Sequence, residues 1–410
     1  MPAFDPVRDA LRTSSSSTST RRATDLSVLL NDPQSMPLVP YSPVTRLSPP
    51  DLLNVPLTPS EMDMYKSFRG PGALRLMKRK RRASEDAEDQ PAHKKLAGDV
   101  GVVVDHYNSR PDVGVVQRSE SPIIGLKNFN NWVKSVLITR FAHPALAKSS
   151  GKGATTSRGG LSGKVLDMGC GKGGDMTKWG KARVKEYYGV DIAAMSIEQA
   201  RSRWRGHSSR FDAKFAALDC YTEPLSEAFT PAMLSQPFDV VSMQFCMHYA
   251  FETLQKARCM LENVSKYLRT GGVFIGTIPN AEFLLEQLNT LPPDAKDLSF
   301  GNSVYKVTFE KQSDKPIFGH KYWFFLKDAV ENVPEYVVYW DNFVQMAAEY
   351  KLQPVYKQEF HGVYEEHQNH PEFGPLMVRM KVVDSDGASA MDEDQWEAAN
   401  IYIAFAFEKQ

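Results

Sequence analysis

The residues best suited to chemistry lie in one short run, VLDMGCGKGGDMTKW, between Val165 and Trp179. Glycines let a backbone approach a ligand without Cβ clashes, and this run has four, Gly169, Gly171, Gly173 and Gly174. Carboxylates close the apolar segments on either side: Asp167 precedes the glycines, and Asp191 follows Gly171 by twenty positions. That spacing is the usual reach from a glycine turn to a ribose hydroxyl. The run therefore predicts a binding site for a nucleotide-like cofactor.

The order of the glycines separates two classes of cofactor. Dinucleotide-binding enzymes favour G-x-G-x-x-G, with the pyrophosphate at the helix N-terminus, whereas this run reads G-x-G-x-G-G. Asp167, two positions before the first glycine, would repel a pyrophosphate and attract a cationic amino-acid end, such as that of S-adenosylmethionine. We therefore favour a methyltransferase over a dehydrogenase, and over a turn that merely joins a strand to a helix.

A helix predicted before this run carries a second group of polar side chains. Between about Asn128 and Arg140, apolar residues recur at helical spacing, at Phe129, Trp132, Val133, Val136 and Leu137. Asn130, Asn131 and Lys134 project together from the opposite stripe. Periodicity alone assigns these three side chains to the solvent.

The order of the later elements favours an α/β fold with a doubly wound, mainly parallel sheet. Strands and helices alternate from Val165 onward, after a Gly/Ser/Thr-rich stretch at residues 148–163 that is typical of a flexible insertion. The predicted strands end in turn at Asp167, Asp191, Asp219, Gln244 and Ile278. Polar residues at four consecutive strand ends are expected if a ligand lies across the carboxyl edge of the sheet.

Two further predictions complete the sheet. Residues 251–268 have the apolar spacing of a helix, which Gly271 and Gly272 are expected to end. Residues 352–360 and 401–407 are predicted strands, and together they can close the sheet as an antiparallel pair.

The first quarter of the chain differs in composition from the rest. The chain has 410 residues, of which 42% are hydrophobic, and its formal net charge is zero, so whole-chain charge indicates no partner. Residues 1–101 are rich in Ser, Thr, Pro and Arg without periodicity, which predicts a disordered regulatory and targeting arm before a folded domain at 102–410. The basic cluster at 78–82, with Lys94 and Lys95, is a nuclear import signal, a phosphate-binding patch or a solvated run.

Other patterns are less specific. The four cysteines form no C-x-x-C pair and follow no secretory signal, so we expect reduced thiols in an intracellular protein, and no apolar run reaches transmembrane length. His367 and His370 have metal-like spacing without an evident third ligand, so we expect a surface loop. Residues 277–280 are similar to a motif of amino-methyltransferases but follow the fifth strand rather than the fourth. Acidic residues 392–394 are expected in a solvated loop.

Seven blocks of the sequence together resemble a known family. They are HisTyrAsn at 106–108, LKNFNNWVKSVLI at 126–138, VLDMGCGKGGDMTKW at 165–179, YYGVDIA at 187–193, QFCMHYAF at 244–251, ValProGlu at 333–335 and IYIAFAFEK at 401–409. In this order they resemble the eukaryotic, fungal-type mRNA cap guanine-N7 methyltransferases, over nearly everything from Val104 onward. The resemblance implies a class I S-adenosylmethionine-dependent methyltransferase fold, which is Rossmann-like with a seven-stranded, mainly parallel sheet and an antiparallel last strand.

The resemblance also implies two sets of site residues. Together with Asp167, the residues that would contact S-adenosylmethionine are Lys134, Gly169, Asp191, Asp219, Gln244 and Tyr249. Those that would contact the RNA cap are Asn130, Asn131, Lys172, Lys178, Arg203, His248, Glu335 and Tyr402. Of these, His248, Glu335 and Tyr402 would position the substrate without acting as acid or base. Glu335 can accept from the ring N–H and the exocyclic amine of guanine, a pair of donors that adenine lacks.

The implied reaction transfers a methyl group from S-adenosylmethionine to N7 of the cap guanosine of pre-mRNA in the nucleus, leaving S-adenosylhomocysteine. Because N7 has a free lone pair, the reaction needs in-line positioning but no general base, protein nucleophile or metal. The implied partners are the capped 5′ end and, through the arm, RNA polymerase II or the capping guanylyltransferase; we expect a monomer and no membrane. The alternatives are a methyltransferase of this fold that acts on a small molecule, and a non-catalytic RNA-binding relative.

Overall fold

The computed structural model describes residues 98–109, 119–149, 161–206 and 211–410. The basic cluster and nearly all of the predicted arm lie outside these ranges, as do residues 150–160 of the predicted insertion. The first helix within these ranges, α5, spans Asp99–Ser109, so the predicted domain boundary at residue 102 falls inside a helix.

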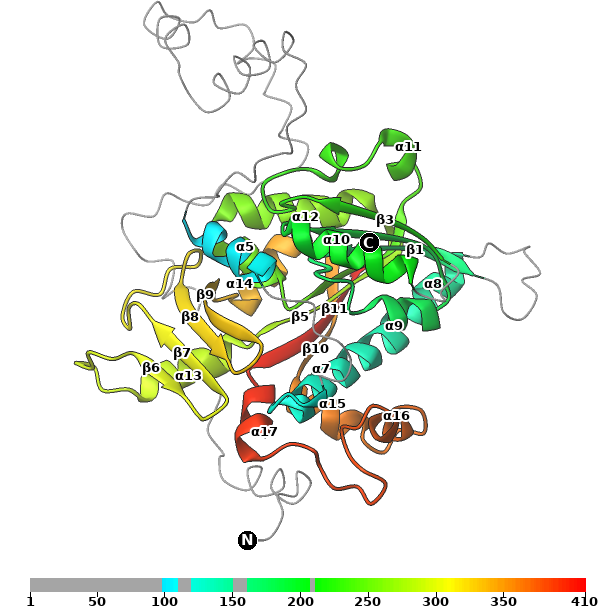
Figure 1. Ribbon diagram of the computed structural model, residues 1–410. Coiled ribbons are helices and arrows are strands. Elements are labelled where there is room, and N and C mark those ends of the chain that lie inside the picture. Colours follow the sequence, from blue (N-terminus) through cyan, green and yellow to red (C-terminus); the bar gives the residue numbers. More distant parts are fainter. Residues whose placement is uncertain (1–97, 110–118, 150–160, 207–210) are drawn as a thin grey trace, which may run out of the picture. The chain divides into compact units, whose positions relative to one another are not determined.

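A seven-stranded sheet lies at the centre of the described chain, with the order β10-β11-β5-β4-β1-β2-β3 (Figure 1). Its strands are β1 (Ser162–Met168), β2 (Val184–Asp191), β3 (Asp212–Ala217), β4 (Phe238–Gln244), β5 (Leu268–Pro279), β10 (Leu352–Glu359) and β11 (Tyr402–Lys409). The first five strands pair in parallel, whereas β11 runs antiparallel to both of its neighbours. This topology confirms the predicted fold class, including the antiparallel last strand.

Helices cover the sheet on both faces. On one face, Val165 and Tyr187 share a core with the π-helical turn η4 (Ile138–Ala142) and with α8 (His143–Ser149) and α9 (Met176–Lys181). On the other face, Phe405 and Phe407 pack against Phe343 of α14 (Trp340–Glu349), with ring centroids 5.7 and 5.0 Å apart. Because both faces are buried, the strands read as apolar runs rather than alternating ones.

Further helices are α7 (Ile124–Leu137), α10 (Ala194–Arg205), α11 (Pro231–Leu234), α12 (Leu254–Tyr267), α13 (Ala281–Thr290), α15 (Phe360–His367), α16 (Phe373–Arg379) and α17 (Glu393–Ala399), with 3-10 turns η5 (Leu225–Glu227) and η6 (Met247–Glu252). All five residues of the predicted apolar stripe of α7 are buried, which confirms that this side of the helix faces the core. The helix begins at Ile124, earlier than predicted, and includes Gly125, where a Cβ atom would meet the Ala390 carbonyl oxygen at 2.5 Å. That glycine permits a close approach rather than breaking the helix.

Some predicted element ends were wrong. Helix α12 ends at Tyr267 without a glycine, and β5 begins at the next residue, so Gly271 and Gly272 lie within a strand. Strand β3 ends at Ala217, so Asp219 lies in the following loop. The start of α12 is set by Thr253, whose side chain accepts from the backbone N–H of Lys256.

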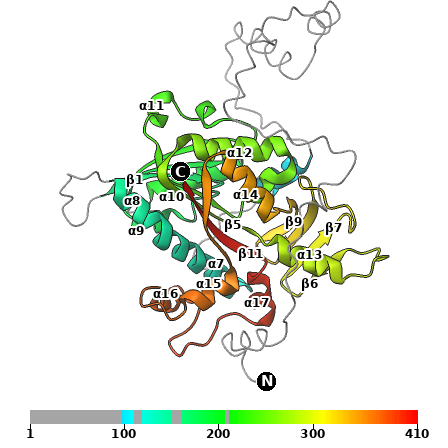
Figure 2. The ribbon, with the colours of Figure 1, turned by 180° about the vertical axis from the view of Figure 1, so that it is seen from behind.

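A second, four-stranded antiparallel sheet, which was not predicted, lies between α13 and α14 in the chain. Its strands are β6 (Ser299–Gly301), β7 (Tyr305–Phe309), β8 (Lys321–Leu326) and β9 (Val330–Tyr336). Figures 1 and 2 show this yellow sheet beside the seven-stranded sheet from opposite sides. Tyr322 and Phe324 on its inner face share one core with Phe129 and Trp132 of α7. The stripe of α7 packs on helices α15–α17 and on β11, within the core that the second sheet shares.

The prediction of a surface loop was also wrong for two segments. His367 is 5% exposed at the end of α15, where its Nε2 lies 3.1 Å from an Arg140 nitrogen, whereas His370 is exposed in the following turn. The acidic stretch starts α17: Asp392 caps the helix by accepting from the Gln395 N–H, and Asp394 accepts from the Ser303 N–H at 3.2 Å. Carboxylates at a helix N-terminus are favoured by its dipole.

The four cysteines form no disulfide, as predicted. Within the ranges described, no helix combines the length and the apolar character needed to cross a membrane.

Candidate active site

A cavity of about 280 Å³ opens at the carboxyl ends of the parallel strands. Its lining includes five of the predicted cofactor residues: Gly169, Asp191, Asp219, Gln244 and Tyr249. They come from the ends of β1, β2 and β4 and from the segments that follow β3 and β4. The parallel topology thus brings together residues that span eighty positions of the chain.

The glycine turn after β1 forms the floor of this cavity. Gly169 and Gly171 have φ angles of 73° and 51°, a region that other residues rarely adopt. A Cβ atom at Gly169 would meet Cys246 Sγ at 2.5 Å, so this position requires glycine for space as well. At Gly171 a Cβ atom would meet nothing within 4 Å, which leaves open space beside the lining for a ligand.

Asp191 offers acceptors at the end of β2. Its two carboxylate oxygens each accept one backbone N–H, from Gly171 and from Ala193, both at 2.9 Å. Burial raises the pKa of this carboxyl, and the two N–H groups oppose that shift. Each oxygen retains a lone pair, so the group can still accept from two ribose hydroxyls.

The wall beyond Asp191 follows β3. Asp219 holds its own turn, accepting from the Tyr221 N–H at 3.0 Å and from the Thr222 hydroxyl at 2.9 Å. Its neighbours Leu218, Cys220 and Tyr221 line the cavity with apolar and aromatic surface. A flat heterocycle such as adenine fits this combination of an apolar wall and a polar edge.

Thr277 forms hydrogen bonds with Gln244, the last residue of β4, and with Phe245, which follows it. The Thr277 hydroxyl donates to Gln244 Oε1 at 3.2 Å and accepts from the Phe245 N–H at 3.0 Å. Phe245 has a φ of 60°, an unusual conformation for a residue with a Cβ atom. Residues 277–280, which sequence reasoning set aside, therefore shape the cavity without lining it.

Helix α5 covers the cavity, which sequence reasoning missed. Val103, Val104 and Tyr107 of α5 belong to the lining. The helix is tied at its start by Asp99, which accepts from the Tyr336 hydroxyl at 2.7 Å, and at its end by Asn108, which accepts from the Met195 N–H at 3.2 Å. The HisTyrAsn block at 106–108 was the available signal, although no role was attached to it.

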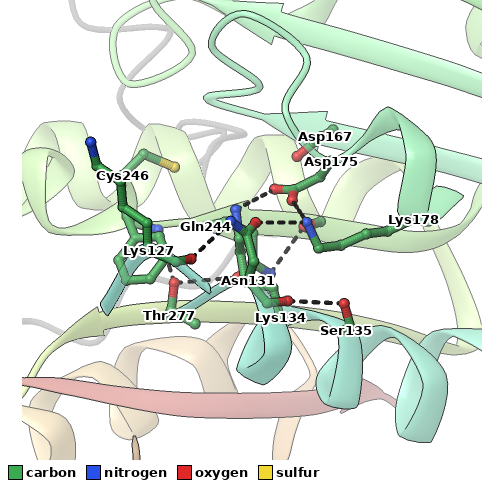
Figure 3. Close-up of polar contacts among 12 residues, drawn as sticks. Lys127, Asn131, Lys134, Ser135, Asp167, Asp175, Lys178, Gln244, Cys246 and Thr277 are labelled. Carbon is green, nitrogen blue, oxygen red and sulfur yellow. Dashed lines mark hydrogen bonds and ion pairs between the residues drawn. The ribbon is translucent and has the colours of Figure 1, made fainter. Parts of the chain in front are cut away.

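The polar stripe of α7 lies against the glycine turn rather than in the solvent (Figure 3). Asp175 accepts from Lys134 at 2.9 Å and from Lys178 at 2.6 Å, and Lys178 also donates to Asn131 Oδ1 at 2.9 Å. The three charged side chains are only 11–14% exposed. Burial alone would raise the pKa of Asp175, but the two lysines outweigh it and hold that pKa well below its usual range. Asp175 is a site residue that sequence reasoning overlooked within the glycine run.

Asp167 lies outside the cavity lining and is 2% exposed. Its Oδ2 accepts from the Tyr187 hydroxyl at 2.8 Å. Burial, together with the nearby charge of Asp175, raises the pKa of Asp167 to about 7. Lys134 likewise lies beside the cavity without lining it. Asp167 and Lys134 thus lie outside the cavity lining, behind the glycine turn.

Three predicted substrate-positioning residues meet next to the cavity. Glu335, on β9, is 4% exposed and accepts from the Tyr322 hydroxyl at 2.8 Å and from the Tyr249 hydroxyl at 3.4 Å. His248 Nε2 lies 3.3 Å from Glu335 Oε1, although the two do not form a well-aligned hydrogen bond. Tyr402 is close enough for the charge of Glu335 to raise its pKa further, after burial, above the ordinary value. Tyr322 was missed because its strand was not predicted.

The other predicted residues lie around this centre. Asn130 Oδ1 is buried without a hydrogen-bond partner in the part of the chain that the structure describes. Lys172 is half-buried in the glycine turn, and Arg203 is half-buried in the last turn of α10. Among the described residues, no group of three His, Cys, Asp or Glu side chains is placed to hold a metal ion.

Known proteins resemble this chain over most of its described part. Residues 90–410 match the family described as the mRNA (guanine-N(7))-methyltransferase domain. The mRNA cap guanine-N(7) methyltransferase of Cryptococcus neoformans is 51% identical over 346 residues, which are 82% of this chain and 53% of that protein. The protein of the same name from Schizosaccharomyces pombe is 46% identical, over 75% of this chain and 82% of its own length. That from Saccharomyces cerevisiae is 39% identical, over 75% and 70%. The chain spans about half the length of its Cryptococcus relatives.

Proposed function

The chain belongs to the mRNA cap guanine-N7 methyltransferase family, and on that premise we propose that it transfers the methyl group of S-adenosylmethionine to N7 of the guanosine cap of an mRNA. The cavity at the carboxyl edge of the sheet is the proposed cofactor site, and the enclosure around Glu335 is the proposed guanine site.

The observation that carries this proposal is the contact between Glu335 and Tyr249. Tyr249 lines the cavity, and its hydroxyl donates to Glu335 Oε1 at 3.4 Å, so a buried carboxylate stands directly beside the cofactor site. Such a carboxylate can accept from both donors on the Watson–Crick edge of guanine. A guanine held there would lie next to the methyl donor.

The lining residues suit S-adenosylmethionine. Asp191 accepts from the ribose hydroxyls, and the wall at residues 218–221 takes the adenine. Gly169 and Gly171 leave room for the part of the ligand that lies against the backbone. The ring of Tyr249 favours a positive charge near the ring. When bound, the cofactor supplies an electrophilic methyl group on a sulfonium.

The protein then contributes position and electrostatics. Because guanine N7 needs no proton removed, the side chains have only to hold N7 in line with the methyl group, an effect worth up to roughly 7–11 kcal/mol in ideal intramolecular models. His248 and Tyr402 enclose Glu335 and limit the orientations of the base. Lys178, Lys172, Arg203, Asn130 and Asn131 are proposed to meet the cap phosphates and sugars, since cations and amides suit a triphosphate bridge.

One assay tests this proposal against its alternatives. The full-length protein is incubated with radiolabelled S-adenosylmethionine and RNA that carries an unmethylated GpppG end, and the RNA is then digested to identify the labelled base. Label in 7-methylguanosine is expected. RNA that is bound but never labelled would indicate a non-catalytic relative, and label that enters only small molecules would indicate the other class of methyltransferase.

We also propose that the protein acts in the nucleus as a monomer. The basic cluster at 78–82 supports nuclear import, and size-exclusion chromatography with light scattering would test the monomer. A fluorescent fusion in which these five residues are replaced by glutamine should lose nuclear accumulation. The arm remains the proposed contact for RNA polymerase II or the capping guanylyltransferase, which a pull-down with and without residues 1–97 would test.

A further inference from the structure

The outer face of the four-stranded sheet presents aromatic and cationic side chains side by side. Along β8, Tyr322, Phe324 and Leu326 point into the core, so the alternate residues point outward. Among these, Phe325 is 38% exposed, and Trp323 is half-buried. Register places Lys306 of β7 opposite Phe325, and Lys327 follows β8 directly. We call Lys306, Trp323, Phe325 and Lys327 the outer strip.

The charges of the outer strip are unevenly compensated. Lys321 approaches the Trp323 ring at 5.5 Å but is paired with Glu310 at 2.7 Å, and the Trp323 indole N–H donates to the same carboxylate at 3.3 Å. Lys306 and Lys327 are exposed and form no ion pair with another described residue. The strip thus combines two aromatic faces with two cations available for an anion.

One ion pair joins helix α7, which carries the proposed cap contact Asn131, to the turn at the end of the outer strip. The turn after β8 carries Asp328, whose carboxylate accepts from Lys127 of α7 at 2.6 Å. The carbonyl of Lys127 in turn accepts from the Asn131 side chain at 2.9 Å, and Asn131 is a proposed cap contact. The proposed cap contact Asn131 thus lies one helical turn from Lys127, the residue that holds the turn at the end of β8.

We propose that the outer strip binds the RNA that follows the cap, with bases stacked on Phe325 and Trp323 and phosphates on Lys306 and Lys327. Exposed aromatic residues on a middle strand, flanked by lysines, suit single-stranded RNA because every base has a face that stacks and every nucleotide has a phosphate. A protein partner would leave both lysines without a compensating charge unless it were acidic. This inference rests on the proposed cap methylation and extends its substrate from the cap to the transcript.

The length of the substrate tests the proposal in the full-length protein. N7 methylation is compared for the GpppG dinucleotide and for a capped oligouridylate that extends beyond the cap. The wild-type protein is expected to show the lower KM for the capped oligouridylate. Phe325→Ala should raise that KM by roughly fivefold or more, the loss expected for one stacked base, and leave the kcat and KM for GpppG unchanged. Phe325→Trp should keep the advantage of the longer substrate.

A second measurement addresses the lysines separately from the aromatic rings. Replacing Lys306 and Lys327 by glutamine should flatten the dependence of log affinity for uncapped oligouridylate on log salt by about 0.7 per lysine. The matched control is Val378→Ser on α16, a position that is 43% exposed and far along the chain from the outer strip. That variant should change neither measurement.

The outcomes separate the two proposals. If neither substrate is methylated, the proposed function fails. If GpppG is methylated but the KM for the capped oligouridylate is no lower, the outer strip does not bind RNA. The same conclusion follows if the lower KM is kept in Phe325→Ala and in the double lysine variant. A contact with a protein would then be the better explanation of the outer strip. A loss of activity on GpppG in Phe325→Ala would also overturn the proposal, because it would place the effect in the cap site.

Discussion

Three carboxyl groups near the glycine turn have different environments and therefore different shifts in pKa. Asp191 keeps two backbone N–H donors at the edge of the cavity, Asp175 is held ionised by Lys134 and Lys178, and Asp167 is buried against a tyrosine. Burial raises the pKa of Asp191 and raises that of Asp167 to about 7, whereas the two lysines hold the pKa of Asp175 well below its usual range. The sequence places all three within one motif and its partner strand, whereas their partners determine what each can do.

The raised pKa of Asp167 predicts a pH-dependent stability of the cofactor-free protein. Between its ordinary value of 3.8 and about 7, the folded protein holds a proton on Asp167 that the unfolded chain has lost. The contribution of this group to the free energy of unfolding therefore falls as the pH rises through that window. Asp167→Asn cannot titrate, so its Tm relative to the wild type should rise from pH 4 to pH 7.

Thermal unfolding monitored by circular dichroism across that pH range measures the difference. The exposed Asp212 on β3 provides the control, because Asp212→Asn should show a Tm difference that does not vary in the same way. A Tm difference between Asp167→Asn and the wild type that stays constant across this pH range would show that Asp167 does not hold a proton in the folded protein.

Glu335 is predicted to determine recognition of guanine. Glu335→Ala removes both acceptors from the enclosure and should lower kcat/KM for GpppG by at least roughly 100-fold, since a site built to pair with donors fails without its acceptors. The Kd for S-adenosylmethionine, measured by calorimetry, should remain nearly unchanged. Glu331, exposed on the same strand, offers a matched control. Normal methylation of GpppG by Glu335→Ala would show that guanine is recognised elsewhere.

Thr277 is predicted to position the end of β4. In Thr277→Val the Gln244 side chain loses a donor and the Phe245 N–H loses its hydroxyl acceptor, while side-chain volume is kept. Each lost hydrogen bond costs about 1 kcal/mol net, so the two losses together should weaken cofactor binding by up to roughly thirtyfold. The KM for GpppG should rise as well, because Phe245 packs on Tyr402 with ring centroids 4.8 Å apart. Thr277→Ser keeps the hydroxyl and should restore both values. Equal effects of Val and Ser would contradict a hydrogen-bonding role.

At the scale of elements, α5 links the two halves of the site. Asp99 ties its first turn to Tyr336 of β9, the strand that also carries Glu335, and Asn108 ties its last turn to the start of α10. Between them, one face of the helix lines the cavity. A lining of the proposed cofactor site and the strand of the proposed guanine site are thus connected through a single helix, whose Tyr107 hydroxyl also lies 3.5 Å from the Tyr249 hydroxyl.

Asn108→Ala should loosen α5 and weaken cofactor binding. The Asn108 oxygen serves as a cap for the exposed N–H groups of α10, and loss of such a cap costs about 1 kcal/mol. We expect the Kd for S-adenosylmethionine to rise about fivefold, with faster hydrogen exchange in residues 99–109. Asn108→Asp retains the acceptor and should bind as the wild type does. Unchanged exchange and Kd in Asn108→Ala would show that α5 is held by its apolar contacts alone.

At the scale of the molecule, two cores meet at the site. One core joins the seven-stranded sheet to η4, α8 and α9, and the other joins α7 to the four-stranded sheet and α15–α17. Residue Tyr402 begins β11 and belongs to the second core, while Ala406 of the same strand belongs to the first. A single strand therefore ties the cofactor side to the guanine side.

The extent of these cores predicts that the chain functions without its first residues. The family match begins at residue 90, and every described contact of the site lies at or beyond Asp99. A protein lacking residues 1–89 should therefore methylate GpppG with a kcat/KM within about twofold of the full chain, because the contacts that the structure describes for the site all lie in the part that is kept. A loss of more than tenfold would show that the arm contributes to catalysis directly.

The sequence by itself determined the seven-stranded sheet and the glycine turn, and it placed the acids proposed to bind the cofactor beside them, because these depend on signals that are local in the chain. Apolar runs mark buried strands, glycines mark backbone that needs a positive φ, and the position of Asp191 follows from the length of one βα unit. Residues such as Glu335 and His248 entered only through family resemblance, since nothing near them in the sequence indicates a site.

Only the tertiary structure decided what lies beside that cofactor site. It brought Glu335, Tyr322, His248 and Tyr402 together from four elements, placed α5 over the cavity, and gave Asp167 and Asp175 opposite shifts in pKa. Contacts between residues far apart in the chain depend on how whole elements pack, and the charge of a carboxyl depends on its burial and its neighbours. Neither can be read from spacing along the sequence.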